Sequence, residues 1–194
     1  MKHRKNHLQI QALCEGAVML ALATVLSLIR LFPLPNGGSV NLGMLPLLFY
    51  CLRWGLGKGV LCCTGYALLQ LLIDGAYGWG WQSIIFDYLL AFPLIGFAGL
   101  FHGRKLGFVF GPLVGCTLRF ASHFISGITA WRILAPTEVL GLTTANPYLY
   151  SAVYNGSFIG VDMILCIVLL GAMYIPLKKY MLGLDLQPAA KETA

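Results

Sequence analysis

The sequence YLYSAVYNGSFIGVDMILCIVLLGAMYIP, residues 148–176, decides the fold class of this chain. Its one charged side chain is Asp162. About 20 mostly apolar residues are enough for a helix to cross a lipid bilayer, and this stretch is longer than that. We therefore expect a membrane-spanning helix over 148–176.

The whole chain has the same apolar character. Its 194 residues are 58% hydrophobic and 10% charged, whereas a soluble domain carries about 25% charged residues. We expect an all-α integral membrane protein surrounded by the lipid bilayer, with one domain over 1–182 and a polar C-terminal tail over 183–194. No segment is long and polar enough for us to expect that it folds alone in water as an ATPase domain.

Apolar runs separated by glycine, proline and polar residues divide the chain into six expected transmembrane helices. The apolar run after Ile10 is too long for a signal peptide and ends without a cleavage site, so we interpret it as a retained first helix. The expected helices are about 10–32, 42–54, 57–74, 82–101, 107–130 and 148–176.

The basic residues predict the orientation. The net charge is +6, but these residues lie at the ends of apolar runs, which indicates membrane topology and not nucleic-acid binding. With the amino terminus in the cytoplasm, ten of the 13 basic residues are inside and two, Arg30 and Arg132, are outside. We therefore expect both termini to be cytoplasmic and the chain to cross the membrane several times.

Polar side chains within spanning helices usually serve function or pair with one another. Asp87, His123 and Asn155 are each roughly 8–11 Å below the outer surface at a rise of about 1.5 Å per residue. Three polar groups on three helices at one depth predict a shared pocket that opens to the outside.

One face of the helix over 107–130 is expected to form a wall of this pocket. Arg119, His123, Gly127 and Trp131 recur every four residues, so they share a stripe. Gly127 is expected to leave open space between the imidazole and the indole, which is typical of a ligand wall.

Arg119 and Asp162 have opposite charges and both fall near the middle of the membrane. We expect them to form an ion pair below the pocket, as part of the scaffold and not of the site.

The pocket is expected to bind an aromatic, cationic ligand. The Asp87 carboxylate can neutralise a cation or accept a hydrogen bond from an aminopyrimidine. Aromatic side chains can stack on a flat ring or hold a cation; the candidates are Tyr77, Tyr88, Trp131 and Tyr150. We identify no metal-ligand cluster and no nucleophile paired with a base, so we expect no catalytic residues, no metal and no cofactor.

Several segments resemble the thiamine-specific S component (ThiT/YuaJ-like) family of energy-coupling-factor (ECF) vitamin transporters. RFASHFISG at 119–127 and YSAVYNGSF at 150–158 resemble the fifth and sixth helices of that family. DYLLAF at 87–92, NGGSV at 36–40 and GMLP at 43–46 resemble further family segments.

The resemblance implies a six-helix, multi-pass subunit in the bacterial plasma membrane that captures thiamine from outside and is not itself an enzyme. Its partners would be a transmembrane coupling subunit and two cytoplasmic ATPase subunits, and Ala17 and Ala21 would lie in the docking motif for the coupling subunit. The implied substrate-binding residues are Asp87, Tyr88, His123, Gly127, Trp131, Tyr150, Asn155 and Tyr77.

This chain departs from the family pattern at two places. Asp87 stands where the family has glutamate, and the loop after the first helix has no tryptophan. Other ligands remain alternatives, namely a thiamine precursor with only the pyrimidine or thiazole moiety, or riboflavin. A self-sufficient carrier and a small intramembrane enzyme are further alternatives.

Overall fold

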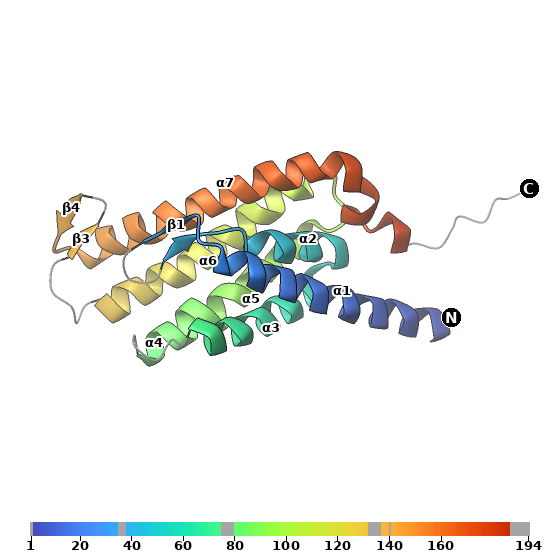
Figure 1. Cartoon of the computed structure of the whole chain (residues 1–194), viewed down its shortest axis with the longest axis horizontal. Helices are drawn as coiled ribbons and strands as arrows, with labels where there is room; N and C mark the ends of the chain where they lie inside the picture. Colours follow the sequence, from blue (N-terminus) through green and yellow to red (C-terminus); the bar gives the residue numbers. More distant parts are fainter. Residues whose placement is uncertain (1, 35–37, 75–79, 132–136, 140, 187–194) are drawn as a thin grey trace, which may run out of the picture.

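The structure, a computed structural model, is a bundle of long helices and describes residues 2–34, 38–74, 80–131, 137–139 and 141–186 (Figure 1). The long or central helices are α1 (Lys2–Leu28), α2 (Met44–Trp54), α3 (Leu56–Asp74), α6 (Gly107–Trp131) and α7 (Pro147–Met181). A composite helix between α3 and α6 consists of α4 (Trp81–Ser83), η3 (Ile84–Leu90), α5 (Ala91–Ile95) and η4 (Gly96–Phe101). Two short hairpins, β1 (Phe32–Pro33) with β2 (Ser39–Val40) and β3 (Thr137–Val139) with β4 (Leu142–Thr144), lie at the same end of the bundle.

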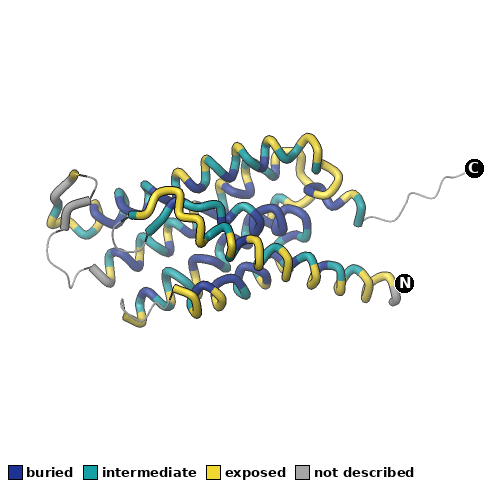
Figure 2. The backbone as a smooth tube through the Cα atoms, viewed as in Figure 1, coloured by how far each residue is buried: buried dark blue, intermediate teal, exposed yellow. Residues whose placement is uncertain are grey.

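The all-α membrane fold expected from the sequence is confirmed. Within the described residues, five helical segments are long and apolar enough to cross a membrane. Figure 2 shows exposed residues along the outward faces of these helices. Many of them are large and apolar, as expected for residues that face lipid. Examples are Leu13 on α1, Leu61 and Leu72 on α3, and Ile164 and Val168 on α7.

The remaining expected helix, over 42–54, corresponds to α2 and lies inside the bundle. Its 11 residues rise roughly 16 Å, about half of a hydrocarbon core of about 30 Å. All residues from Pro46 to Arg53 are buried, and α2 packs against α1, α3, η4, α6 and α7. The other helices therefore shield α2 from lipid.

Non-helical backbone leads into α2 and is stabilised by side chains of α7. The backbone N–H of Gly38 donates to the Tyr154 hydroxyl at 2.8 Å, and that of Asn41 donates to Asp162 Oδ1 at 3.0 Å. Irregular backbone at membrane depth is tolerated where protein buries it and satisfies its polar groups. These two bonds meet that requirement between α1 and α2.

The composite helix changes its winding along its length. The seven residues of η3 are π-helical, and η4 is a 3-10 helix. Pro93 in α5 lacks an N–H, and its ring crowds the carbonyl four residues earlier. The wider π-helical segment η3 lies directly before the helix that holds this proline. Close packing also shapes this segment, because a Cβ on Gly96 or Gly99 would collide with the backbone of α3 or the turn before it. Asp87 and Tyr88 lie in the π-helical turn, a feature that is frequent at functional sites.

The helix boundaries differ from the expected ones at both ends of the chain. Helix α1 begins at Lys2 and ends at Leu28, because the chain then turns into the β1–β2 hairpin. Helix α7 continues through Pro176 to Met181. Beyond it, the 3-10 helix η5 (Leu184–Leu186) packs back on the bundle, so the expected polar tail is anchored over these three residues.

An ionic cluster ties α1, α2 and η5 together, at the end of α2 that faces away from the two hairpins (Figure 1). The Arg53 side chain is 4% exposed, and its guanidinium binds the carboxylates of Glu15 (2.6 Å) and Asp185 (2.8 Å). The Trp54 indole N–H donates to Glu15 Oε2 at 2.7 Å. Because a buried guanidinium is costly unless paired, these contacts explain how Arg53 is accommodated in the core.

Candidate ligand-binding site

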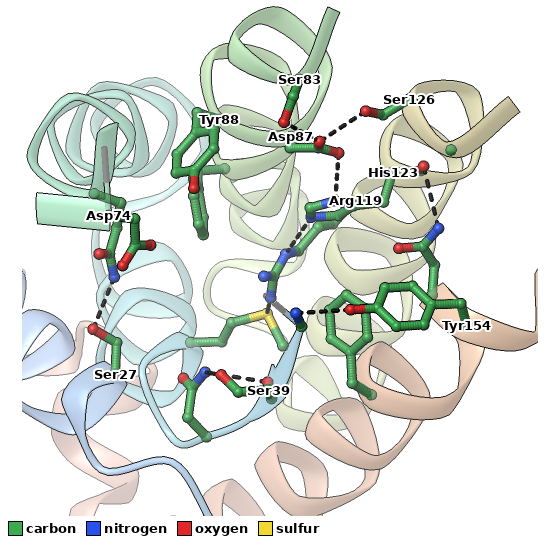
Figure 3. A pocket seen from close by; sticks show the side chains of 18 of the residues that line it. Ser27, Ser39, Asp74, Ser83, Asp87, Tyr88, Arg119, His123, Ser126 and Tyr154 are labelled. Atoms are coloured by element: carbon green, nitrogen blue, oxygen red, sulfur yellow. Dashed lines mark hydrogen bonds and ion pairs between the residues drawn. The ribbon is translucent and has the colours of Figure 1, made fainter. Parts of the chain in front are cut away.

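A cavity of about 200 Å³ lies where the β1–β2 hairpin, α3, the composite helix, α6 and α7 meet. An apolar cavity of roughly 150 Å³ already holds a benzene ring, so this one has room for a ring compound. Its walls mix charged, amide, hydroxyl and aromatic side chains (Figure 3). Such a lining fixes the orientation of a ligand as well as its place.

Six of the eight residues proposed from the sequence line this cavity: Asp87, Tyr88, His123, Gly127, Tyr150 and Asn155. Tyr77 lies outside the described residues. Trp131 is the last residue of α6, and its side chain lies outside the described part of the structure. Ala17 and Ala21 are exposed on α1, away from the cavity.

The Asp87 carboxylate accepts three hydrogen bonds. Ser83 Oγ donates to Oδ2 at 2.6 Å and Ser126 Oγ donates to the same atom at 2.7 Å. His123 Nδ1 lies 2.8 Å from Oδ1. A carboxylate has about four lone-pair sites, so one remains for a ligand, and the charged group is held in a fixed orientation.

His123 connects Asp87 to a buried arginine. Arg119 Nε donates to His123 Nε2 at 3.3 Å. Because Nε2 accepts this bond, Nδ1 carries the ring proton and donates it to Asp87. The imidazole is thereby assigned one tautomer and one orientation.

Arg119 lies at the cavity and not below it, which corrects the expectation from the sequence. Its Nη1 is 4.0 Å from Asp162 Oδ2 and donates to Met44 Sδ at 2.7 Å, and its guanidinium carbon is 5.0 Å from the centre of the Phe92 ring. Arg119 reaches the cavity because its long side chain extends from α6 as far as Met44 and Phe92.

Asp87, Arg119 and Asp162 form a chain of charges through the neutral His123. Arg30 and Asp74 also line the cavity, so three carboxylates and two guanidiniums leave an excess of one negative charge. Water cannot screen this charge well in a buried site, so the arrangement favours a cationic ligand.

Gly127 serves close packing, in contrast to the open space that we expected. A Cβ at this position would collide with the Oγ of Ser151 and lie 2.8 Å from its Cβ. Ser151 Oγ in turn donates to the Phe124 carbonyl at 2.9 Å. Glycine therefore allows α7 to approach α6 closely at the cavity wall.

Asn155 fixes this contact from α7. Its Nδ2 donates to the His123 carbonyl at 3.2 Å and to Ser151 Oγ at 3.1 Å. No described residue donates to its Oδ1, which leaves an acceptor for a ligand.

An aromatic wall, which the sequence analysis named only in part, runs along α7. The rings of Tyr150 and Tyr154 stack with centroids 5.8 Å apart and an angle of 12°. Phe158 meets Tyr154 edge-on at 5.8 Å and His123 at 5.9 Å. Tyr154 and Phe158 could have been found from their spacing, because 150, 154 and 158 recur every four residues on one helix face. Ser83 could have been found in the same way, because it lies four residues before Asp87 and therefore on the same helix face.

The site contains serine, histidine and aspartate, but not in the arrangement of a hydrolase. Ser83 and Ser126 both donate to Asp87, and among the described residues no serine forms a hydrogen bond with the His123 ring. A serine nucleophile needs a histidine base within hydrogen-bonding reach. The geometry is suited to binding and orienting a ligand.

Comparisons with known proteins agree on one family. The family described as thiamine transporter protein (Thia_YuaJ) matches residues 13–182. The chain is 28% identical over 184 residues to the thiamine transporter ThiT of Bacillus subtilis, covering 86% of this chain and 92% of that protein. It is 25% identical over 186 residues to ThiT of Lacticaseibacillus paracasei, covering 87% of this chain and 89% of that one.

A solved structure of ThiT from Listeria monocytogenes has the same fold. Its TM-score is 0.76 at 24% identity, covering 89% of this chain and 98% of that one. With the long apolar helices, these relatives place the chain in the bacterial plasma membrane as a multi-pass protein. The family match spans most of the chain and includes every residue of the cavity described above, so the chain belongs to the thiamine transporter (Thia_YuaJ) family.

Proposed function

We propose that this chain binds thiamine with high affinity as the S component of an ECF-type ABC transporter that imports the vitamin. The observation that carries the proposal is Asp87, whose carboxylate is held by three donors beside aromatic rings in a site with excess negative charge. Thiamine joins an aminopyrimidine to a cationic thiazolium ring. The amino group of the pyrimidine would donate to the remaining lone pair of Asp87. The positive charge of the thiazolium ring would offset the excess negative charge of the site.

Aromatic and imidazole groups would hold the two rings. The planes of Tyr150 and Tyr154 are nearly parallel, and Tyr88 lines the cavity near Phe92. A cation over an aromatic face is stabilised by about 0.5–2 kcal/mol. We also expect Trp131 and Tyr77 to contribute from the outer side.

The chain itself would perform no chemical step, and ATP hydrolysis would come from two cytoplasmic ATPase subunits through a transmembrane coupling subunit. The exposed Ala17 and Ala21 support this, because small side chains one turn apart let a partner helix approach closely. The arrangement of basic residues supports cytoplasmic termini. Uptake by this chain alone in liposomes, without ATP, would indicate a self-sufficient carrier instead.

Titration of the purified protein with thiamine tests the proposal. Saturable binding to wild type is expected, with quenching of tryptophan fluorescence. Asp87→Ala and His123→Ala are each expected to weaken binding by about 100-fold, since each leaves a charge-assisted hydrogen bond unmade. Arg104→Gln, at an exposed position outside the cavity, is the control and should bind as wild type does. Absent binding by wild type, or unchanged binding by both site variants, would reject the proposal.

A further inference from the structure

The cavity has a second polar wall on α3, opposite Asp87 and His123. Tyr66, Gln70 and Asp74 recur every four residues and all line the cavity. Figure 3 shows Asp74 and Ser27 on the side of the cavity away from His123 and Ser126. Neither the expected site nor the family resemblance assigns a role to this wall.

Gln70 contributes a buried amide to this wall, next to the buried hydroxyl of Tyr66. Its side chain is 5% exposed, although an amide in a membrane-spanning helix is costly unless it is hydrogen-bonded. Its Nε2 donates to Ser27 Oγ at 2.8 Å and also to the Tyr66 hydroxyl. Both amide protons are therefore used, and the side chain has one orientation.

Two further contacts hold these partners in place. Ser27 Oγ donates to the Thr24 carbonyl at 2.8 Å. The Tyr66 ring packs edge-on against Phe92 with centroids 4.9 Å apart. The amide of Gln70 is thus supported by α1, α3 and α5, which is how a site residue is kept in a fixed geometry.

The Gln70 carbonyl oxygen remains open. No described residue donates to Oε1, and this oxygen is not fully buried. Because Gln70 lines the cavity, Oε1 is open to the cavity. A fixed acceptor in a partly enclosed site selects a ligand that carries a donor at that point.

We propose that Gln70 Oε1 accepts a hydrogen bond from the hydroxyl group at the end of the ligand that is far from Asp87. This rests on the proposed function, because thiamine carries its hydroxyethyl group on the thiazolium ring, remote from the aminopyrimidine. Ser27 and Tyr66 act as positioning residues that orient the amide. Gln70 therefore contributes to the selection of the hydroxyl-bearing vitamin over analogues without a hydroxyl group.

A comparison of two ligands on two proteins tests this assignment. The ligands are thiamine and deoxythiamine, in which hydrogen replaces the hydroxyl group. Wild type should bind deoxythiamine about tenfold more weakly, the size expected for one hydrogen bond whose loss leaves a buried acceptor unpaired. Equal affinities of wild type for the two ligands would overturn the assignment, whatever the variants do.

The variant Gln70→Met, of similar length, should bind thiamine about tenfold more weakly and should no longer distinguish the two ligands. Gln70→Glu keeps an acceptor and should retain the preference for thiamine. The control Gln82→Met alters a glutamine that does not line the cavity and should behave as wild type. Equal losses for both ligands in Gln70→Met would mean a structural role and would also overturn the assignment.

The same data separate this assignment from the broader proposal. Absence of thiamine binding by wild type would contradict the proposed function itself. Tight thiamine binding with no discrimination against deoxythiamine would leave that function standing and reject the role of Gln70 alone.

Discussion

His123 Nδ1 lies 2.8 Å from Asp87 Oδ1, and this bond joins α6 to the π-helical turn η3. Asp87 and His123 were predicted from the sequence to lie at the same depth on different helices, and they are in direct contact. Through Arg119 and Asp162 the same network extends to the backbone of Asn41, ahead of α2. The ligand site and the non-helical segment beside it therefore share one set of polar contacts.

The negative charge of Asp87 should affect thiamine affinity more than the length of its side chain does. Asp87→Asn keeps the size of the side chain but removes the negative charge and an acceptor, so thiamine affinity should fall by about 30–100-fold. Asp87→Glu keeps the charge, although its extra methylene disturbs the bonds from Ser83 and Ser126, and the loss should be smaller. Calorimetric titration of both variants measures the difference. A larger loss in Asp87→Glu than in Asp87→Asn would contradict this account.

Gly127→Ala should destabilise the contact between α6 and α7. Its Cβ would collide with Ser151, and overpacking of this kind costs about 1–3 kcal/mol. Thermal unfolding in detergent should show a lower midpoint, and the second substitution Ser151→Gly should restore part of it. Gly160→Ala on α7 is the matched control, because nothing lies within 4 Å of a Cβ there. Equal shifts of the unfolding midpoint in Gly127→Ala and Gly160→Ala would show that position 127 does not need glycine for close packing.

Asp162 has two separable roles. Asp162→Asn keeps an acceptor for the Asn41 N–H but removes the charge that faces Arg119, whereas Asp162→Ala removes both. An unsatisfied buried donor costs about 1–3 kcal/mol, so the alanine variant should unfold at the lower temperature. Thermal unfolding of the two variants in detergent shows which of them has the lower midpoint. Identical midpoints would mean that the bond to Asn41 does not stabilise the fold.

The cluster around Arg53 should anchor the C-terminal end of the described chain. Arg53→Lys keeps the charge but cannot form the paired bonds to Glu15 and Asp185. We expect a loss of about 1–3 kcal/mol in stability. Arg104→Lys, at an exposed position, should have no measurable effect. Limited proteolysis should also cleave near residue 186 faster in Arg53→Lys, and an unchanged cleavage rate would argue against anchoring by this cluster.

The sequence predicted the helices and much of the cavity because both depend on simple periodicity. A repeat of four residues placed Arg119, His123 and Gly127 on one face, and the structure has all three at the cavity. The same rule would have indicated Tyr154, Phe158 and the α3 wall around Gln70. Those residues were missed because tyrosine, phenylalanine and a lone amide are common in helix packing.

Other features depend on three-dimensional packing and could not be predicted from spacing. The π-helical turn that carries Asp87 precedes Pro93 and packs against neighbouring helices. The pattern Gly111-x-x-x-Gly115 is of a kind that arises by chance in a glycine-rich chain, yet a Cβ at either glycine would approach Leu52 or the Ile95 backbone within 3 Å. Gly156 and Gly160 have the same spacing and make no such close contact. Spacing alone cannot separate the two cases.

A structure of the protein with thiamine bound tests the central claim most directly. We predict thiamine in the cavity with its amino group on Asp87, its rings beside His123 and Tyr150, and its hydroxyl group toward Gln70. Thiamine bound elsewhere, or an empty cavity at saturating thiamine, would contradict the account.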